Sequence, residues 1–191
     1  MSIVSYIVIA LALGICNMLL FRRCGESFPI RLSAGITVSF TVSAVHVILY
    51  LLGALIGSLL CFYSPDNPTL YADINAYIFL GINIIVIIKG LLPYLRRNPR
   101  LPLFDLTSRG SVLAMAAATG INALLIGLGV GFVEQHISIH KIIWPLLTTS
   151  LLFSYLGLMF GRRKVTLRPR RWMIVASVLL LGVAIAAVVN A

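Results

Sequence analysis

The sequence predicts an all-α, polytopic membrane protein in which six transmembrane helices form an inverted 3+3 repeat. Of its 191 residues, 60% are hydrophobic and only 10% are charged, whereas about a quarter of the residues of a soluble domain are charged. Six apolar stretches are each long enough to cross the ~30 Å hydrocarbon core of a bilayer at about 1.5 Å of helix rise per residue. A soluble enzyme is therefore excluded, and the lipid bilayer is the first predicted partner.

The first repeat is predicted over residues 1–95, with spans at about 3–21, 32–63 and 74–95. Two arginines, at positions 22 and 23, close the first span, and the turn-rich segment SPDNPTLYAD separates the second span from the third. The second span is longer than one straight crossing needs, so we expect it to tilt, to protrude or to break near Gly53 or Gly57.

The second repeat is predicted over residues 111–191, after a basic cytoplasmic loop at 96–110, with spans at about 111–133, 142–160 and 172–189. Its first span, SVLAMAAATGINALLIGLGVGFV, carries no charge. Within that span the tetrapeptide NALL, which starts at Asn122, resembles NMLL, which starts at Asn17 in the first span of the chain. The likeness suggests a duplicated unit with an amide at the same depth in each half.

The basic residues predict the orientation. Fourteen of the 15 Lys and Arg lie in the first, third and fifth loops or at the adjoining helix ends, and only Lys141 lies elsewhere. The positive-inside rule places those loops in the cytoplasm and both termini outside, and it explains the +10 net charge without nucleic acid as a partner. Three spans per half invert the second half relative to the first, and transporters with this architecture bind substrate near the midplane between the repeats.

Three polar side chains inside the spans are the candidate binding residues: Asn17, His46 and Asn122. An unpaired amide in hydrocarbon costs several kcal/mol, so each asparagine needs a partner within the bundle. Either the amides hold helices together or they contribute to a common site. His46 is the one ionisable group deep in a span, where it is either a ligand and proton carrier or a neutral ring paired with a carbonyl or a serine. Asn83, Thr119 and Thr149 are candidate supporting residues.

A metal site in this sequence would have few anionic ligands. All five acidic residues lie in or beside loops, whereas a hard cation such as Mn²⁺ prefers oxygen ligands that usually include carboxylate. Asn17, Asn122 and His46 are therefore the candidate metal ligands for a transported cation, and no resident cofactor is predicted. His136 and His140 could bind metal at the outer surface, but two histidines alone are a weak signal and a solvated loop is the better interpretation of that pair.

The chain resembles the MntP-type manganese efflux pumps of bacteria, within the lysine-exporter superfamily. The resemblance rests on the order of several short motifs: ALALGICN at 10–17, the glycines at 53 and 57, LG at 80–81, KG at 89–90, ATGINA at 118–123, GLGVGF at 127–132, TTS at 148–150 and LGLMFGR at 156–162. It implies a multi-pass protein of the bacterial cytoplasmic membrane that exports a divalent cation.

This chain departs from the family pattern by losing acids. The pattern has Asp where this sequence has Asn17 and Asn122, and Glu where it has His46, Lys89 and Met173. Three interpretations follow: a divergent exporter of a cation or small solute, a member that exports a different and less charged solute, or a membrane scaffold that transports nothing.

Overall fold

The structure is a computed structural model that describes residues 1–28, 31–61, 68–95, 103–134 and 139–190. Within these ranges the chain is all-α, with no strand, as predicted. The helices are α1 (Ile3–Ser27), α2 (Leu32–Leu60), α3 (Pro68–Leu95), α4 (Arg109–Val133), α5 (Ile139–Arg162) and α6 (Pro169–Val189). Each helix is long and apolar enough to cross a membrane.

The helices extend beyond most of the predicted spans. The first continues past Arg22 and Arg23 to Ser27, and α3 begins at Pro68, six residues before the expected start. Charged residues near the end of a span can stay helical because their long side chains reach the headgroup region. The second helix runs without interruption through Gly53 and Gly57, so the break considered for this segment does not occur.

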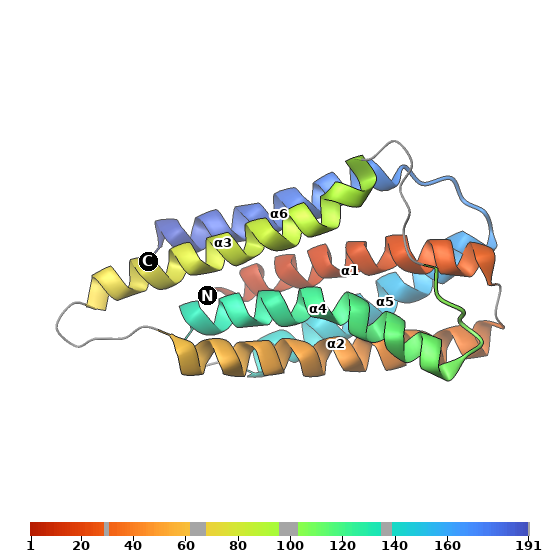
Figure 1. Cartoon of the computed structure of the whole chain (residues 1–191), viewed down its shortest axis with the longest axis horizontal. Coiled ribbons are helices and arrows are strands. Elements are labelled where there is room, and N and C mark those ends of the chain that lie inside the picture. The colour runs from red at the N-terminus through yellow and green to blue at the C-terminus, as the bar shows by residue number, and fades with distance from the viewer. Residues whose placement is uncertain (29–30, 62–67, 96–102, 135–138, 191) are drawn as a thin grey trace.

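Successive helices run in opposite directions along the bundle (Figure 1). Both termini lie at one end, which we call the terminal end. At the opposite end, which we call the basic end, α1, α3 and α5 finish and α2, α4 and α6 begin. Ten of the twelve described Lys and Arg gather at the basic end, Lys89 and Lys141 being the other two: Arg22, Arg23, Arg31, Arg109, Arg162, Arg163, Lys164, Arg168, Arg170 and Arg171.

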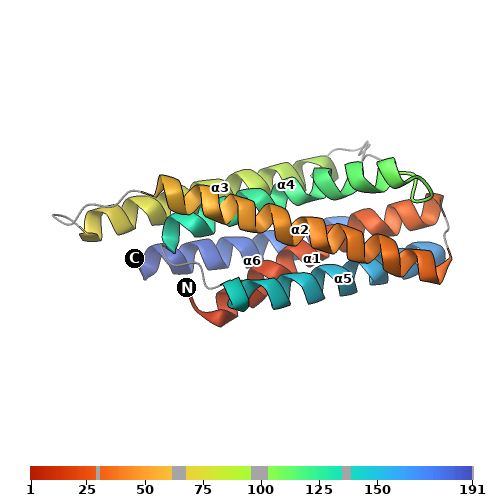
Figure 2. The ribbon, with the colours of Figure 1, turned by 90° about the horizontal axis from the view of Figure 1, so that it is seen from below.

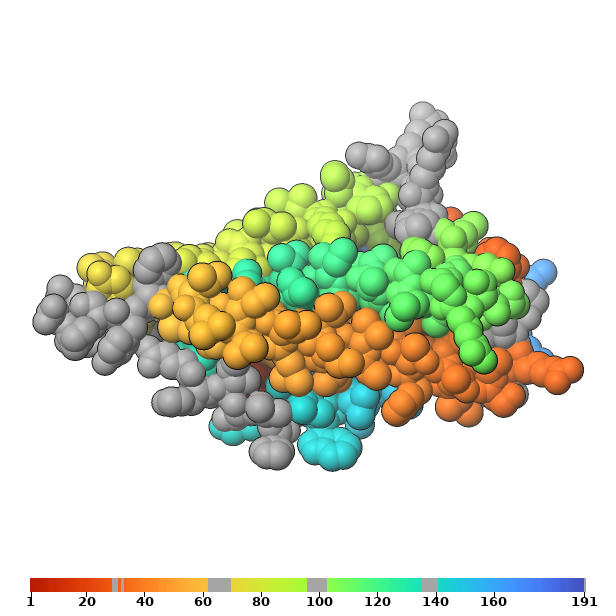
Figure 3. All heavy atoms as spheres, turned by 60° about the horizontal axis from the view of Figure 1, so that its bottom comes forward, coloured from red at the N-terminus to blue at the C-terminus, as the bar shows by residue number. Residues whose placement is uncertain are grey.

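Glycines allow two helix pairs to approach closely. Along the α2–α4 pair, a Cβ added to Gly53 would collide with the carbonyl oxygen of Leu124, and one added to Gly127 would collide with that of Tyr50. The two helices accordingly lie against each other along much of their length (Figures 2 and 3). In the α1–α5 pair, a Cβ on Gly157 would lie 2.5 Å from the carbonyl oxygen of Met18. Small residues are the usual means by which membrane helices pack at short range.

The contacts of the α1–α5 pair recur in the α2–α4 pair. Each α1 residue corresponds to the α4 residue 106 positions later (14 to 120), and each α2 residue to the α5 residue 104 positions later (49 to 153). The matched contacts are Gly14–Phe153 with Gly120–Leu49, Gly25–Leu158 with Gly131–Ala54, Gly157–Met18 with Gly53–Leu124, and Gly161–Arg22 with Gly57–Leu128. This correspondence is consistent with the expected inverted repeat.

The same correspondence changes the match between the two asparagines. An offset of 106 pairs Asn17 with Ala123, and Asn122 with Cys16, which is one residue away from the match suggested by the two tetrapeptides. One residue turns a helical side chain by about 100° around the axis. Asn17 and Asn122 are therefore not expected to point into the same place.

The outward surface of the bundle is apolar. Large hydrophobic side chains are well exposed on it, including Leu59 on α2, Tyr77 on α3, Trp144 on α5 and Val178 on α6. In water such a surface would be unfavourable, since soluble monomers rarely expose contiguous apolar patches larger than a few hundred Å². A lipid environment accounts for it.

Candidate functional site

A buried polar cluster lies near the middle of four helices. Asn17 of α1, His46 of α2 and Ser150 of α5 are each 2% exposed or less, and Thr119 of α4 is partly buried beside them. The Asn17 Nδ2 donates to Ser150 Oγ at 3.0 Å and lies 3.0 Å from His46 Nδ1. On the other side of the ring, His46 Nε2 lies 2.7 Å from Thr119 Oγ1. We call these four residues the central cluster.

The hydrogen-bond pattern assigns the protons of the central cluster. The Thr119 hydroxyl donates to the Met115 carbonyl at 2.9 Å, so it accepts from an N–H at His46 Nε2. His46 Nδ1 then carries the lone pair and accepts from the Asn17 amide. The imidazole is therefore neutral in this arrangement, with the proton on Nε2. The network contains no formal charge.

His46 and Ser150 occupy corresponding positions in the two halves. They are 104 residues apart, the same offset that relates Leu49 to Phe153, and Ser150 Oγ lies 3.2 Å from His46 Nδ1. Asn17 and Thr119 then approach this pair from α1 and α4, and their own counterparts, Ala123 and Leu13, are apolar. Each half therefore supplies two polar residues to the central cluster, but only His46 and Ser150 are counterparts of each other.

Asn122 has a different partner. Its Oδ1 accepts from Lys89 Nζ at 3.1 Å, on the exposed side of α3 and α4. Cys16, the counterpart of Asn122 in the first half, has its sulfur atom 3.9 Å from that of Met173 on α6. The structure thus brings together Asn17, His46 and Thr119 from the sequence-predicted set, and it places Asn122 beside Lys89.

The other predicted supporting residues bond to their own helices. The Asn83 Nδ2 donates to the Phe79 carbonyl at 2.9 Å, and the Thr149 hydroxyl donates to the Pro145 carbonyl at 2.6 Å. Neither of these bonds joins the central cluster. The predicted pair His136 and His140 falls on side chains outside the described part of the structure.

Sequence reasoning missed a buried polar stripe on α2. Ser39, Ser43, His46 and Tyr50 are each 1% exposed or less, and their spacing of four, three and four residues places them on one face of the helix. Within the described part of the chain, the hydroxyls of Ser39 and Tyr50 have no hydrogen-bond partner, and neither does that of Ser154 on α5. The spacing was visible in the sequence and could have indicated this stripe.

Glu134 forms a further polar contact at the terminal end. It follows α4 directly, its side chain is 12% exposed, and its carboxylate accepts from the Tyr6 hydroxyl and from the amino group of Met1. Glu26, at the basic end, is 46% exposed and lies 3.8 Å from Arg22. Among the described residues, no group of three His, Cys, Asp or Glu side chains is placed to hold a metal ion.

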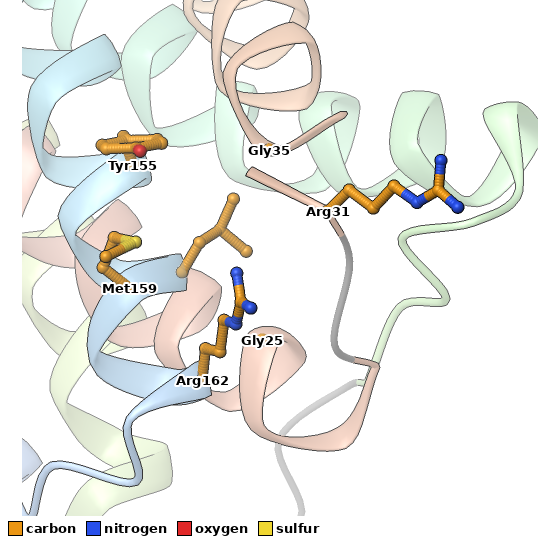
Figure 4. A pocket seen from close by; sticks show the side chains of 7 residues that line it. Gly25, Arg31, Gly35, Tyr155, Met159 and Arg162 are labelled. Atoms are coloured by element: carbon orange, nitrogen blue, oxygen red, sulfur yellow. The ribbon is translucent and has the colours of Figure 1, made fainter. Parts of the chain in front are cut away.

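A shallow pocket lies at the basic end, between α1, α2 and α5. Its lining includes Gly25, Gly35, Tyr155 and Leu158, with Arg162 and Arg31 at its edge. Figure 4 shows the Arg162 guanidinium beside the hollow, whereas the Arg31 guanidinium points away from it. With arginine as its charged residue and no acid in its lining, this pocket does not suit a cation.

The model of the Mntp family, described as a putative manganese efflux pump, matches residues 29–188. His46, Thr119 and Ser150 lie inside this match, whereas Asn17 lies before it on α1. Comparisons with curated proteins and with solved structures find no match. Because the family match covers most of the chain and the structure has six membrane-type helices, the protein belongs to the putative manganese efflux pump family.

Proposed function

We propose that this protein exports a cation, with Mn²⁺ as the leading candidate, across the bacterial cytoplasmic membrane through the central cluster. The observation that carries the proposal is the meeting of Asn17, His46, Thr119 and Ser150, from four helices, at the middle of the bundle. Membership of the efflux family supports transport as the activity. In this proposal, residues 1–95 and residues 111–191 form two repeats of opposite orientation. The site lies between them at mid-membrane, as in other transporters of that architecture.

The central cluster can offer a cation oxygen and nitrogen lone pairs without a carboxylate. The ligands are the ring Nδ1 of His46, the hydroxyls of Ser150 and Thr119, and the amide oxygen of Asn17 after rotation of the amide. A cation held by these neutral groups keeps part of its water shell, as hard divalent ions commonly do. Binding is therefore weak, and protonation of His46 weakens it further by adding a positive charge and removing the Nδ1 lone pair.

Asn122 and Lys89 are not part of the proposed cation site. A lysine ammonium beside the amide opposes cation binding there, so we propose that Asn122 holds Lys89 and does not contact the cargo. In the proposed orientation the basic end faces the cytoplasm and both termini face outward. Cargo then enters from the basic end and leaves at the terminal end.

The neutral network favours one other candidate function, the export of a less charged solute. A site without formal charge does not discriminate strongly in favour of a divalent ion, and hydroxyl and amide groups can bind polar uncharged groups equally well. A scaffold that transports nothing is the remaining alternative from the sequence. Manganese tolerance and cellular manganese separate cation export from both of these alternatives.

The test is manganese tolerance and total cellular manganese in a bacterial host that lacks its own exporter. The proposal predicts that the natural chain raises tolerance and lowers cellular manganese, and that His46→Ala loses both effects at equal expression. Thr149→Val is the matched control, because its hydroxyl bonds to its own helix. Failure of the natural chain to lower manganese would leave the solute exporter or the scaffold as the better interpretation.

A further inference from the structure

We propose that the hydroxyls of Tyr50 and Ser154 bind the cargo cation on the two sides of the central cluster, Tyr50 toward the terminal end and Ser154 toward the basic end. We call these two groups the flanking hydroxyls. The inference rests on the proposed function, because it names the ligands that a cation meets just before and just after the central cluster. Failure of either idea gives a different experimental result.

Both flanking hydroxyls are buried without a hydrogen bond. Tyr50 and Ser154 are each 0% exposed, and within the described residues neither hydroxyl has a hydrogen-bond partner. Other helical serines are satisfied locally, since the Ser43 and Ser177 hydroxyls each donate to the carbonyl four residues earlier at 2.8 Å. A buried hydroxyl without a partner is uncommon in native structures. The lone pairs of the flanking hydroxyls are therefore available to a ligand that is present for part of the time.

The flanking hydroxyls occupy corresponding positions in the two halves. Tyr50 and Ser154 are 104 residues apart, which is the offset already found between α2 and α5. The contact between His46 and Ser150 lies at the centre of this correspondence, because each of the two residues is the counterpart of the other. The same unusual state, a buried hydroxyl without a partner, thus occurs at two related positions on opposite sides of one contact. This repetition indicates a shared role.

Each flanking hydroxyl belongs to a residue one helical turn from the central cluster. Tyr50 follows His46 by four residues on α2, which runs toward the terminal end, and Ser154 follows Ser150 by four on α5, which runs toward the basic end. Four residues correspond to about 6 Å of helix rise on nearly the same face. Ser39, whose buried hydroxyl also has no partner among the described residues, lies two turns from His46 on the basic side. A cation from the basic end therefore meets Ser154 before the central cluster and Tyr50 after it.

The central cluster joins two closely packed helix pairs. The bond of Asn17 to Ser150 lies within the α1–α5 pair, and that of His46 to Thr119 lies within the α2–α4 pair. The contacts of His46 with Asn17 and Ser150 join one pair to the other. Glycine contacts hold each pair together. In the proposed transport cycle the two pairs rock as bodies about the central cluster, and opening on each side exposes one flanking hydroxyl.

Neutral hydroxyls suit a cation in transit. Serine and tyrosine oxygens are hard donors, which suit ions such as Mn²⁺, Mg²⁺ or Ca²⁺. One neutral oxygen, together with the water that the ion keeps, binds weakly, and a series of weak sites allows an ion both to enter and to leave. Because the flanking hydroxyls have no partner among the described residues, no hydrogen bond within the protein is broken when the ion arrives.

The experiment compares Mn²⁺ flux into sealed proteoliposomes with the unfolding temperature of the same purified variants. Ser154→Ala and Tyr50→Phe remove the flanking hydroxyls with little change of shape, and each is expected to lower the flux about threefold or more. Because each change also removes a buried polar group without a partner, the unfolding temperature is expected to stay the same or to rise. Ser177→Ala and Tyr77→Phe are the matched controls and are expected to keep the natural flux, since the Ser177 hydroxyl bonds to its own helix and Tyr77 is 61% exposed on α3.

Unchanged flux in either Ser154→Ala or Tyr50→Phe would overturn the inference, since a ligand is required on each side. An equal loss of flux in the controls, or a loss that accompanies a lower unfolding temperature, would also overturn it, because altered packing then explains the effect. If His46→Ala abolishes the natural flux while both variants retain it, the flanking hydroxyls are refuted and the proposed function stands. Absence of flux from the natural chain refutes the proposed function and the flanking hydroxyls together.

Discussion

At the scale of the residue, the chemistry of the central cluster depends on which nitrogen of His46 carries the proton. The Thr119 hydroxyl determines which nitrogen is protonated, because it donates its own hydrogen to the Met115 carbonyl and must accept a hydrogen bond from the ring. Asn17 then meets the lone pair of Nδ1 from the other side. The result is a neutral ring whose free electron pair faces the middle of the site.

Replacing Thr119 by valine should disturb this arrangement more than the same change at Thr149. Thr119→Val leaves the His46 Nε2–H without its acceptor, which costs about 1–3 kcal/mol when the group is buried. Thr149→Val removes a hydroxyl that bonds to its own helix. We expect Thr119→Val to lower the unfolding temperature of the purified protein and to reduce manganese export. Equal behaviour of the two variants in both assays would contradict the assigned role of Thr119.

A carboxylate at position 17 should strengthen the site, whereas one at position 122 should not. Asn17 lies 3.0 Å from His46, and Asn122 lies beside Lys89. In a low-dielectric site, a negative charge next to a divalent cation is worth several kcal/mol. At about pH 8, where the imidazole is neutral, Asn17→Asp should raise manganese tolerance above that of the natural chain. If Asn122→Asp raised manganese tolerance and Asn17→Asp did not, position 122 would have to be part of the cation site.

At the scale of the element, backbone contact determines which helices are neighbours. Carbonyl oxygens of α4 lie against Gly53 and Gly57 of α2, so these residues have no room for a side chain. Of the three alternatives considered for this long segment, the break near these glycines does not occur, because they allow a continuous helix to pack closely. Packing against α4 keeps the helix intact despite the low helix propensity of glycine.

Two glycine-to-alanine changes separate packing from helix propensity. Gly127→Ala places a methyl group against the Tyr50 carbonyl, which should destabilise the protein by about 1–3 kcal/mol or more through overpacking. Gly182→Ala, in α6, has no heavy atom within 4 Å of its new methyl group and should be neutral or slightly stabilising. The stability of both variants is measured as the temperature at which the monodisperse peak in size-exclusion chromatography is lost. Similar curves for the two variants would argue against the α2–α4 contact.

At the scale of the whole molecule, helix number and helix direction could be predicted from the sequence. A bilayer requires long apolar helices because an unpaired backbone group in hydrocarbon is costly. Such helices can be recognised as long apolar stretches in the sequence alone. The concentration of arginines at one end also follows from the sequence. The exact helix ends could not be predicted, because Arg22 and Arg23 stay helical beyond the apolar stretch.

The candidate site was only partly predictable. His46 was identifiable because it is the one ionisable group deep in a span, but its partner Ser150 lies 104 residues away and is joined to it only by packing. The match between Asn17 and Asn122 differed by one residue from the observed correspondence, enough to turn the second amide toward Lys89. Glu134 was assigned to a loop because sequence does not show that Tyr6 would cover it.

The orientation of the bundle can be tested with single cysteines. Cys24 is buried and reports poorly, so the informative positions are exposed ones: Thr166 near the basic end and Lys141 near the terminal end. With Cys61 replaced by serine, we expect an impermeant thiol reagent to label Lys141→Cys in intact cells and Thr166→Cys only after the cells are opened. The reverse pattern would invert the proposed direction of transport.

The most direct test of cation export through the central cluster is Mn²⁺ flux into sealed proteoliposomes that contain the purified protein. We predict that the natural chain carries Mn²⁺ faster than empty vesicles, that His46→Ala reduces this flux at least about tenfold by removing the central ligand of the cluster, and that Thr149→Val leaves it unchanged. Flux that is equal for the natural chain and His46→Ala, or absent from the natural chain and from Asn17→Asp alike, would contradict export through the central cluster.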